Sequence, residues 1–277
     1  MRPLLDALSS ALFPAPCALC HQTLLRFSSL PICDACWSAV HPQTGELCSH
    51  CGEDLGLPQT SLASPDPAAP RLCPNCETAR PLFARAVAYT RYDAPIRGLI
   101  RLLKYDGMEP VATRLGRLLA PAVAALPIAP GTRVLVVPVP IHRTRRRLRG
   151  FNHAERIATA LTRELARTAK AQRWTMARGL LRRQRPTESQ SRLSPAARRR
   201  NLQAAFTVPE AARLRGRAIL LVDDIYTTGA TAVACSRALL AAGAAEVWVA
   251  TVARTHREGV ALWDETDTLI SPENAVP

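Results

Sequence analysis

Two adjacent carboxylates followed by a hydroxyl-rich turn are the first residues of this chain whose types and spacing could do chemistry. Asp223 and Asp224 come after the apolar run 218–222 and before the sequence T-T-G-A-T at 227–231. Carboxylates accept hydrogen bonds from vicinal hydroxyls, whereas threonine hydroxyls and free backbone N–H groups donate to an anion. Gly229 lets the backbone close around that anion because it has no Cβ. The pattern predicts a site for a ribose 5-phosphate.

Other interpretations of this acidic pair fit the sequence less well. A P-loop ATPase also places an acid after an apolar strand, but the chain contains neither G-x-x-x-x-G-K-[ST] nor G-x-G-x-x-G. An ordinary capped turn needs one or two polar residues, not D-D-x-x-T-T-G-x-T. A metal-dependent nuclease is disfavoured because adjacent side chains on a strand point in different directions and no third acid lies nearby in sequence.

Eight cysteines form four C-x-x-C pairs near the amino end of the chain. Four thiolates complete a tetrahedral structural site, so eight match two zinc ions. We favour consecutive pairing of the C-x-x-C motifs, although an interleaved arrangement satisfies the same spacing. His21, His41 and His50 lie close by, and we expect them to be bystanders because eight thiols already satisfy two ions. The predicted ligands are Cys17, Cys20, Cys33 and Cys36 for one ion and Cys48, Cys51, Cys73 and Cys76 for the other.

A disulfide framework is the alternative use of so many cysteines. It requires an oxidising compartment, whereas the apolar run at the amino end is broken by Asp6 and Pro14 and does not read as a secretory signal. No apolar run approaches the roughly 20 residues needed to cross a bilayer. We therefore predict a cytoplasmic protein without a membrane span.

Buried strands and amphipathic helices must position the acidic pair. The unalternating run 218–222 predicts a central strand, and 232–240 predicts the helix after it. Ligands of open α/β sheets bind at the carboxyl ends of strands, where the next helix presents its free N–H groups. Further strands are expected at 134–139, which directs 140–143 at the site, and at 246–252. Helical spacing is expected over 96–103 and 157–166, and Trp248 and Cys235 are expected to be buried packing residues.

The charge distribution indicates an anionic partner. The formal net charge is +14, and arginines concentrate between residues 140 and 217. Phosphates of a small ligand explain part of this excess. The remainder suits a nucleic-acid backbone, although a composition bias toward arginine also explains it, and the 5% aromatic content leaves few rings for base stacking.

The segment V-D-D-I-Y-T-T-G-A-T at 222–231 resembles the phosphoribosyl pyrophosphate (PRPP) signature of type I phosphoribosyltransferases. Together with the cysteine pairs and the segments 92–107, 137–152 and 190–206, it makes the chain similar to the ComF family of competence-associated proteins. Two departures are visible: a Pro-, Ser- and Ala-rich spacer at 56–70, and residues after about 258 that extend past the family's usual end.

The resemblance implies a fold and a domain organisation. It implies an α/β type I phosphoribosyltransferase domain, Rossmann-like with a mainly parallel sheet, preceded by a small zinc-ribbon module. We expect an N-terminal helix and double zinc ribbon at 1–80, the phosphoribosyltransferase-like domain at 81–258 and a disordered tail at 259–277.

The resemblance also implies roles for individual residues in displacement at the anomeric carbon of PRPP, with magnesium pyrophosphate leaving. Asp223 and Asp224 would be the catalytic pair that holds the ribose 2- and 3-hydroxyls. Magnesium would be carried by the ligand more than by protein carboxylates. The PRPP-binding set would be Asp223, Asp224, Tyr226, Thr227, Thr228, Gly229, Ala230 and Thr231, and the candidates for the pyrophosphate would be Arg143, Arg149, Arg182, Arg183 and Arg198.

Two function classes stay open at this point. One is a phosphoribosyltransferase with an unidentified acceptor that acts in DNA uptake, natural competence or DNA utilisation. The other is a non-catalytic protein that senses PRPP or binds single-stranded DNA within the uptake machinery. The expected partners are PRPP and single-stranded DNA, with proteins of the uptake or recombination machinery as further candidates.

Overall fold

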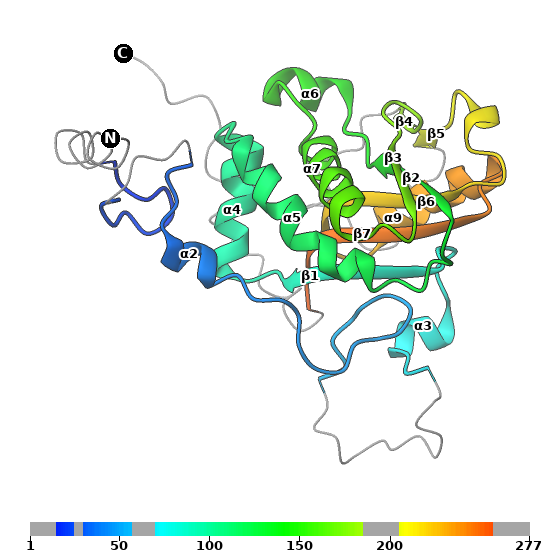
Figure 1. The fold of residues 1–277 in the computed structure, drawn as a ribbon, viewed down its shortest axis with the longest axis horizontal. Helices are drawn as coiled ribbons and strands as arrows, with labels where there is room; N and C mark the ends of the chain where they lie inside the picture. The colour runs from blue at the N-terminus through cyan, green and yellow to red at the C-terminus, as the bar shows by residue number, and fades with distance from the viewer. Residues whose placement is uncertain (1–14, 25–29, 57–69, 185–204, 257–277) are drawn as a thin grey trace.

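The structure is a computed structural model, which describes residues 15–24, 30–56, 70–184 and 205–256. Its centre is a parallel five-stranded sheet with the strand order β1-β7-β6-β2-β3. Figure 1 shows this sheet with helices against it and with the amino-terminal module at its side. The strands are β1 (Arg85–Arg91), β2 (Arg133–Pro138), β3 (Arg173–Met176), β6 (Ala218–Tyr226) and β7 (Glu246–Arg254).

Helices cover both faces of the sheet and divide the apolar core in two. On one face lie α4 (Ala94–Tyr105), α5 (Pro110–Ala124) and α7 (His153–Thr168). On the other lies α9 (Ala230–Ala241), packed on β6 and β7. A parallel strand covered on both faces needs apolar side chains on both, which explains the continuous buried run at the start of β6.

The predicted elements are confirmed, with two differences in detail. Strand β6 runs on to Tyr226, so Asp223 and Asp224 belong to its last four residues and do not follow it. The expected apolar face at 157–166 is buried in α7 except for Ala166, which is exposed. Trp248 and Cys235 are buried as expected.

The amino-terminal module contributes two short helices, α2 (Asp34–Ser38) and α3 (Pro74–Thr78). It is bonded to the exposed edge of the sheet: the Gln43 N–H donates to the Tyr89 carbonyl (2.7 Å), and the Ala86 N–H donates to the His50 carbonyl (2.8 Å). These bonds cover β1, whose edge groups would otherwise lack partners.

Smaller elements lie between these strands along the chain. They are α6 (Arg143–Arg149) after β2, the antiparallel pair β4 (Arg182–Arg183) and β5 (Phe206–Thr207), and the 3₁₀ turn η2 (Ala211–Arg213). Within the described ranges, no helix is long and apolar enough to cross a membrane.

Candidate ribose-phosphate site

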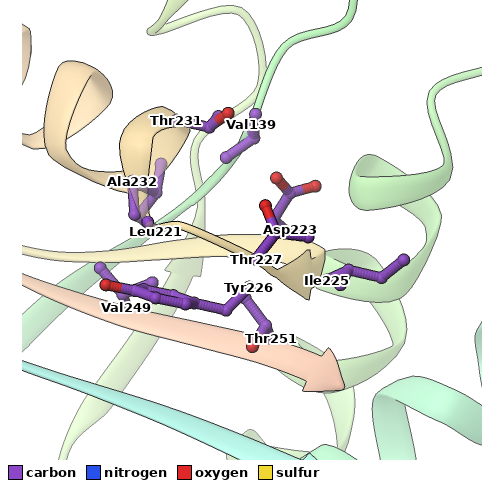
Figure 2. Close-up of a pocket in the computed structure, with 11 residues that line it drawn as sticks. Val139, Leu221, Asp223, Ile225, Tyr226, Thr227, Thr231, Ala232, Val249 and Thr251 are labelled. Atoms are coloured by element: carbon purple, nitrogen blue, oxygen red, sulfur yellow. The ribbon is translucent and has the colours of Figure 1, made fainter. Parts of the chain in front are cut away.

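A pocket lies where β6 ends and α9 begins. Asp223, Thr227, Gly229 and Thr231 line it, together with Val139 from the end of β2. Figure 2 shows the Asp223 carboxylate beside Thr227 and facing the same space as Thr231 and Val139. The pocket therefore combines a carboxylate with hydroxyls at the carboxyl edge of the sheet, where ligands of open α/β folds bind.

The turn between β6 and α9 has the conformation that an anion site requires. Gly229 adopts a left-handed conformation (φ 76°), and α9 begins at the next residue, so the first N–H groups of a 12-residue helix point toward the turn. Thr228 is exposed, and its hydroxyl accepts a hydrogen bond from the Ala230 N–H (3.4 Å). Tyr226 is different: its buried ring lies beneath the turn, and its hydroxyl stands 2.2 Å from where a Cβ at position 229 would be.

The two carboxylates have different surroundings. Asp223 is partly exposed and lines the pocket on the α9 side of β6. Asp224 is only 4% exposed and turns toward α4 and α7, where its partners are. Successive side chains of a strand face opposite sides, so one acid reaches the pocket and the other the helix layer.

Lys104 and His153 surround Asp224. The Lys104 ammonium, near the end of α4, lies 2.5 Å from Asp224 Oδ2, and His153 Nε2 lies 3.6 Å from Oδ1. Asn152 positions this histidine: it caps α7 by accepting from the Ala154 N–H (3.1 Å) and donates to the Val139 carbonyl (3.0 Å). The start of α7 is thereby fixed against the end of β2.

Lys104 and His153 determine the ionisation state of Asp224. Burial opposes the charge on Asp224, but Lys104 and His153 outweigh it and hold the pKa of Asp224 well below its ordinary value. Burial lowers the pKa of His153, which favours the neutral imidazole, whereas Asp224 overcomes burial and raises the pKa of Lys104. Asp224 is thus an ionised carboxylate within a buried ion pair.

Burial and the neighbouring charge of Asp224 raise the pKa of Asp223 well above its ordinary value. A carboxyl group with a raised pKa can both donate to and accept from a ribose hydroxyl. Asp223 is therefore the member of the pair suited to touch a sugar.

Lys104 and His153 were not among the residues singled out in the sequence. One signal was available for Lys104, because it is one of only two lysines in a chain with 36 basic residues, Lys and Arg together. Nothing in the local pattern marks His153, which reaches Asp224 through tertiary packing alone.

The donor atoms of His153, Asp223 and Asp224 lie within 4.8 Å of one another, as a bound cation requires. The Lys104 ammonium is already paired with Asp224, so a divalent ion bound to Asp224 would have to displace this ammonium. Asp223 is left as the protein oxygen that could approach a ligand-borne magnesium ion, and this matches the preference of magnesium for few protein carboxylates and substrate phosphates.

The predicted arginines occupy several places. Arg143 and Arg149 begin and end α6, and neither lines the pocket as the structure describes it. The Arg149 guanidinium lies 5.0 Å from the Tyr105 ring centroid and 3.5 Å from His153 Nδ1. Arg183 stacks on Phe206, and burial lowers its pKa while Asp223 acts in the opposite direction. Arg182 is exposed on β4, and Arg198 lies outside the described residues.

The eight cysteines form two tetrads, in the consecutive pairing that we favoured. Their sulfur atoms lie within 4.8 Å of one another in each set: Cys17, Cys20, Cys33 and Cys36 in the first tetrad, and Cys48, Cys51, Cys73 and Cys76 in the second tetrad. Backbone N–H groups donate to Cys17 Sγ from Cys33 (3.4 Å) and to Cys48 Sγ from Cys73 (3.3 Å). These donors stabilise thiolates, the form that binds zinc, so both tetrads fit structural zinc.

Comparisons with known proteins agree with this organisation. A double zinc ribbon domain matches residues 8–77, and a phosphoribosyl transferase domain matches residues 149–275. The chain is 32% identical to the DNA utilization protein YhgH of Salmonella typhimurium and to that of Escherichia coli K12, over 87% of this chain and 98% of each relative. It is 28% identical to competence protein F of Haemophilus influenzae, over 83% of this chain and 93% of that protein.

Proposed function

The chain belongs to the ComF family, and we propose that it binds PRPP with magnesium at the carboxyl end of β6 and acts as a phosphoribosyltransferase-like protein in DNA uptake or utilisation. Its relatives are named for competence and for DNA utilisation, which supports the process. We also propose a cytoplasmic location, which the grouping of eight cysteines for metal rather than for disulfides supports.

The observation that carries this proposal is the meeting of Asp223 with the turn at 227–231 in one pocket. The start of α9 and the threonine hydroxyls offer donors to a 5-phosphate, while Asp223 accepts from ribose hydroxyls. Asp224 lies on the opposite side of β6, where it pairs with Lys104 and His153. It fixes the end of β6 and places negative charge beside the sugar.

Displacement at the anomeric carbon develops positive charge on the sugar and negative charge on the departing pyrophosphate. Ionised Asp224 stabilises the positive charge by its own charge, and Asp223 holds the sugar in place by hydrogen bonds, so catalysis is mainly electrostatic and positional. Arg183 and the arginines of α6 are described cations that could attract the pyrophosphate. Magnesium carried by the pyrophosphate would supply further neutralisation.

Isothermal titration of the zinc-loaded protein with PRPP, with and without magnesium, tests the proposal. We expect saturable binding that requires magnesium, and at least a tenfold weaker affinity in Asp223→Ala, since the ribose hydroxyl that loses its partner costs about 1–3 kcal/mol. Glu164→Gln, on α7 far along the chain from His153, is the matched control and should bind as the wild type does. Equal affinity in Asp223→Ala and the control contradicts the assignment.

Catalysis is separable from binding. A transferase releases pyrophosphate from PRPP when an acceptor is added, so we propose a screen of nucleobases and of single-stranded DNA ends with pyrophosphate as the readout. Tight binding without release under every acceptor supports the sensing alternative.

Binding of single-stranded DNA is the second function that an observation favours. Helix α6 carries five arginines in seven residues, and no ion pair joins them to an acid in the described part of the chain. Two large apolar side chains stand exposed beside them, Leu148 (82%) and Tyr105 (70%). Unpaired cations next to an aromatic ring suit a single strand, whose phosphates and bases they contact.

Salt-dependent fluorescence anisotropy with a labelled oligonucleotide tests this surface. Each lost phosphate contact lowers the slope of log affinity against log salt by about 0.7 on a single strand. The triple variant Arg145→Gln, Arg146→Gln, Arg147→Gln should therefore lower the slope by about 2, whereas Arg163→Gln with Arg167→Gln on α7 should leave it unchanged. An unchanged slope in the α6 variant rules out this surface.

A further inference from the structure

A buried arginine outside the pocket joins the second tetrad to the phosphate turn. Arg254 ends β7 and is 5% exposed. Its guanidinium donates to the Cys51 carbonyl (2.8 Å) and to Cys51 Sγ (3.5 Å), and it forms a buried ion pair with Glu53. One planar cation thus holds both a zinc-ligating cysteine and the residue two positions after it.

The same guanidinium supports the phosphate turn from below. It lies 4.2 Å from the centroid of the Tyr226 ring, which pairs in register with Arg254 across β6 and β7. The Tyr226 hydroxyl in turn packs against Gly229, where it leaves no room for a Cβ. Movement of Arg254 would therefore move the ring on which the turn rests.

A second set of contacts joins the same two places. His50, between Cys48 and Cys51, stacks on Phe83 at 5.2 Å between ring centroids. Phe83 meets the Tyr226 ring edge-on at 6.3 Å. All these side chains except the partly buried His50 are almost fully buried, so they have little freedom to move independently.

We propose that Arg254 is a positioning residue that couples zinc at the second tetrad to anion binding at the phosphate turn. Four thiolates around one zinc ion carry net negative charge, and the Arg254 donation to Cys51 stabilises that charge and orients the ligand. With zinc bound, the guanidinium is fixed and Tyr226 is held beneath Gly229. Without it, Cys51 loses its fixed place and Arg254 can leave the ring. The anion in this coupling rests on the proposed PRPP site.

Coupling between two binding sites is reciprocal, so it is measurable from the zinc side. The experiment follows zinc release from the full-length protein to a chromogenic chelator, with and without PRPP and magnesium. Wild-type protein should release one of its two zinc ions at least threefold more slowly at saturating PRPP. The same samples titrated by calorimetry report whether PRPP binds.

Variants assign the effect to Arg254. Arg254→Gln should release that zinc ion at least tenfold faster, in the range known for groups that orient metal ligands, and PRPP should no longer slow it. Arg254→Lys keeps the charge but loses the planar fork, so it should restore the rate only in part. Arg114→Gln is the matched control, since Arg114 lies 4.3 Å over the Trp37 ring beside the first tetrad; it should keep the PRPP effect.

The outcomes separate the two proposals. Absence of PRPP binding to the wild type overturns the proposed function and the coupling with it. Normal PRPP binding with zinc release that PRPP does not change overturns the coupling alone, and this result needs no variant. A PRPP effect that persists in a folded Arg254→Gln protein overturns the role of Arg254.

Discussion

The two tetrads have the same ligands and different surroundings. In the first tetrad Cys20 is exposed and Cys33 and Cys36 are partly exposed, whereas all four cysteines of the second tetrad are buried. The first tetrad packs on helix α4, where Leu19 leaves no room for a Cβ at Gly98. The second is bonded to β1 and to Arg254. Identical C-x-x-C motifs therefore have different contacts: the first tetrad packs against helix α4, and the second is hydrogen-bonded to the edge of the sheet.

Removing each zinc site in turn should give the largest difference between the two tetrads in the free energy of unfolding. Cys48→Ser with Cys51→Ser should lower the free energy of unfolding by about 5 kcal/mol or more, because structural zinc stabilises strongly and these side chains are buried. Cys17→Ser with Cys20→Ser should lower the free energy of unfolding clearly less, because the first tetrad is more exposed, and should leave PRPP affinity within about twofold. Chemical denaturation and calorimetry measure both, and equal losses in the two variants contradict the distinction.

Lys104 marks where the helix under the first tetrad reaches the site. Lys104→Met leaves Asp224 as a buried carboxylate without its cation, which costs about 3–5 kcal/mol. Urea denaturation checks this value, with Lys170→Met, an exposed lysine, as the control expected to unfold as the wild type does. A loss below 1 kcal/mol means that the ion pair contributes little to the fold.

Substitution of two glycines tests the contacts near each tetrad: Gly229 packs against Tyr226, which lies beside Arg254, and Gly98 packs against Leu19 of the first tetrad's segment. Gly229→Ala places a Cβ against the Tyr226 hydroxyl at a positive φ and should cost about 1–3 kcal/mol and weaken PRPP binding. Gly98→Ala meets only the end of the flexible Leu19 side chain and should cost less, with PRPP affinity unchanged. Thermal unfolding and titration of the pair test this order, and the reverse order refutes it.

The pH dependence of the Lys104 ion pair is the smallest effect. The folded-state pKa of Lys104 is raised above its ordinary 10.5, so its stabilisation is fully present below pH 10.5 and is lost as the pH rises through the folded value. The difference in unfolding free energy between wild type and Lys104→Met should stay constant from pH 6 to 9 and shrink above about 10.5. Denaturation series at fixed ionic strength measure it, and a difference that shrinks below pH 9 contradicts the sign.

The sequence predicts local chemistry well and tertiary partners poorly. Regular spacing predicted the eight cysteine ligands but left their pairing open, and the structure groups them consecutively. The apolar run before Asp223 predicted the central strand and the edge where the pocket lies. Lys104, His153 and Arg254 carry no local pattern, because packing alone brings them to their partners. Tyr226 was expected among the PRPP-binding residues, yet its ring is buried beneath the turn, and whether it contacts PRPP stays a prediction.

A crystal structure of the zinc-loaded protein with PRPP and magnesium would show whether the pocket at the end of β6 binds PRPP. We expect the 5-phosphate against the backbone N–H groups at 228–231, with Asp223 within hydrogen-bonding distance of a ribose hydroxyl and Asp224 still paired with Lys104. A ligand bound elsewhere, or a turn that stays empty at saturating PRPP, would contradict it.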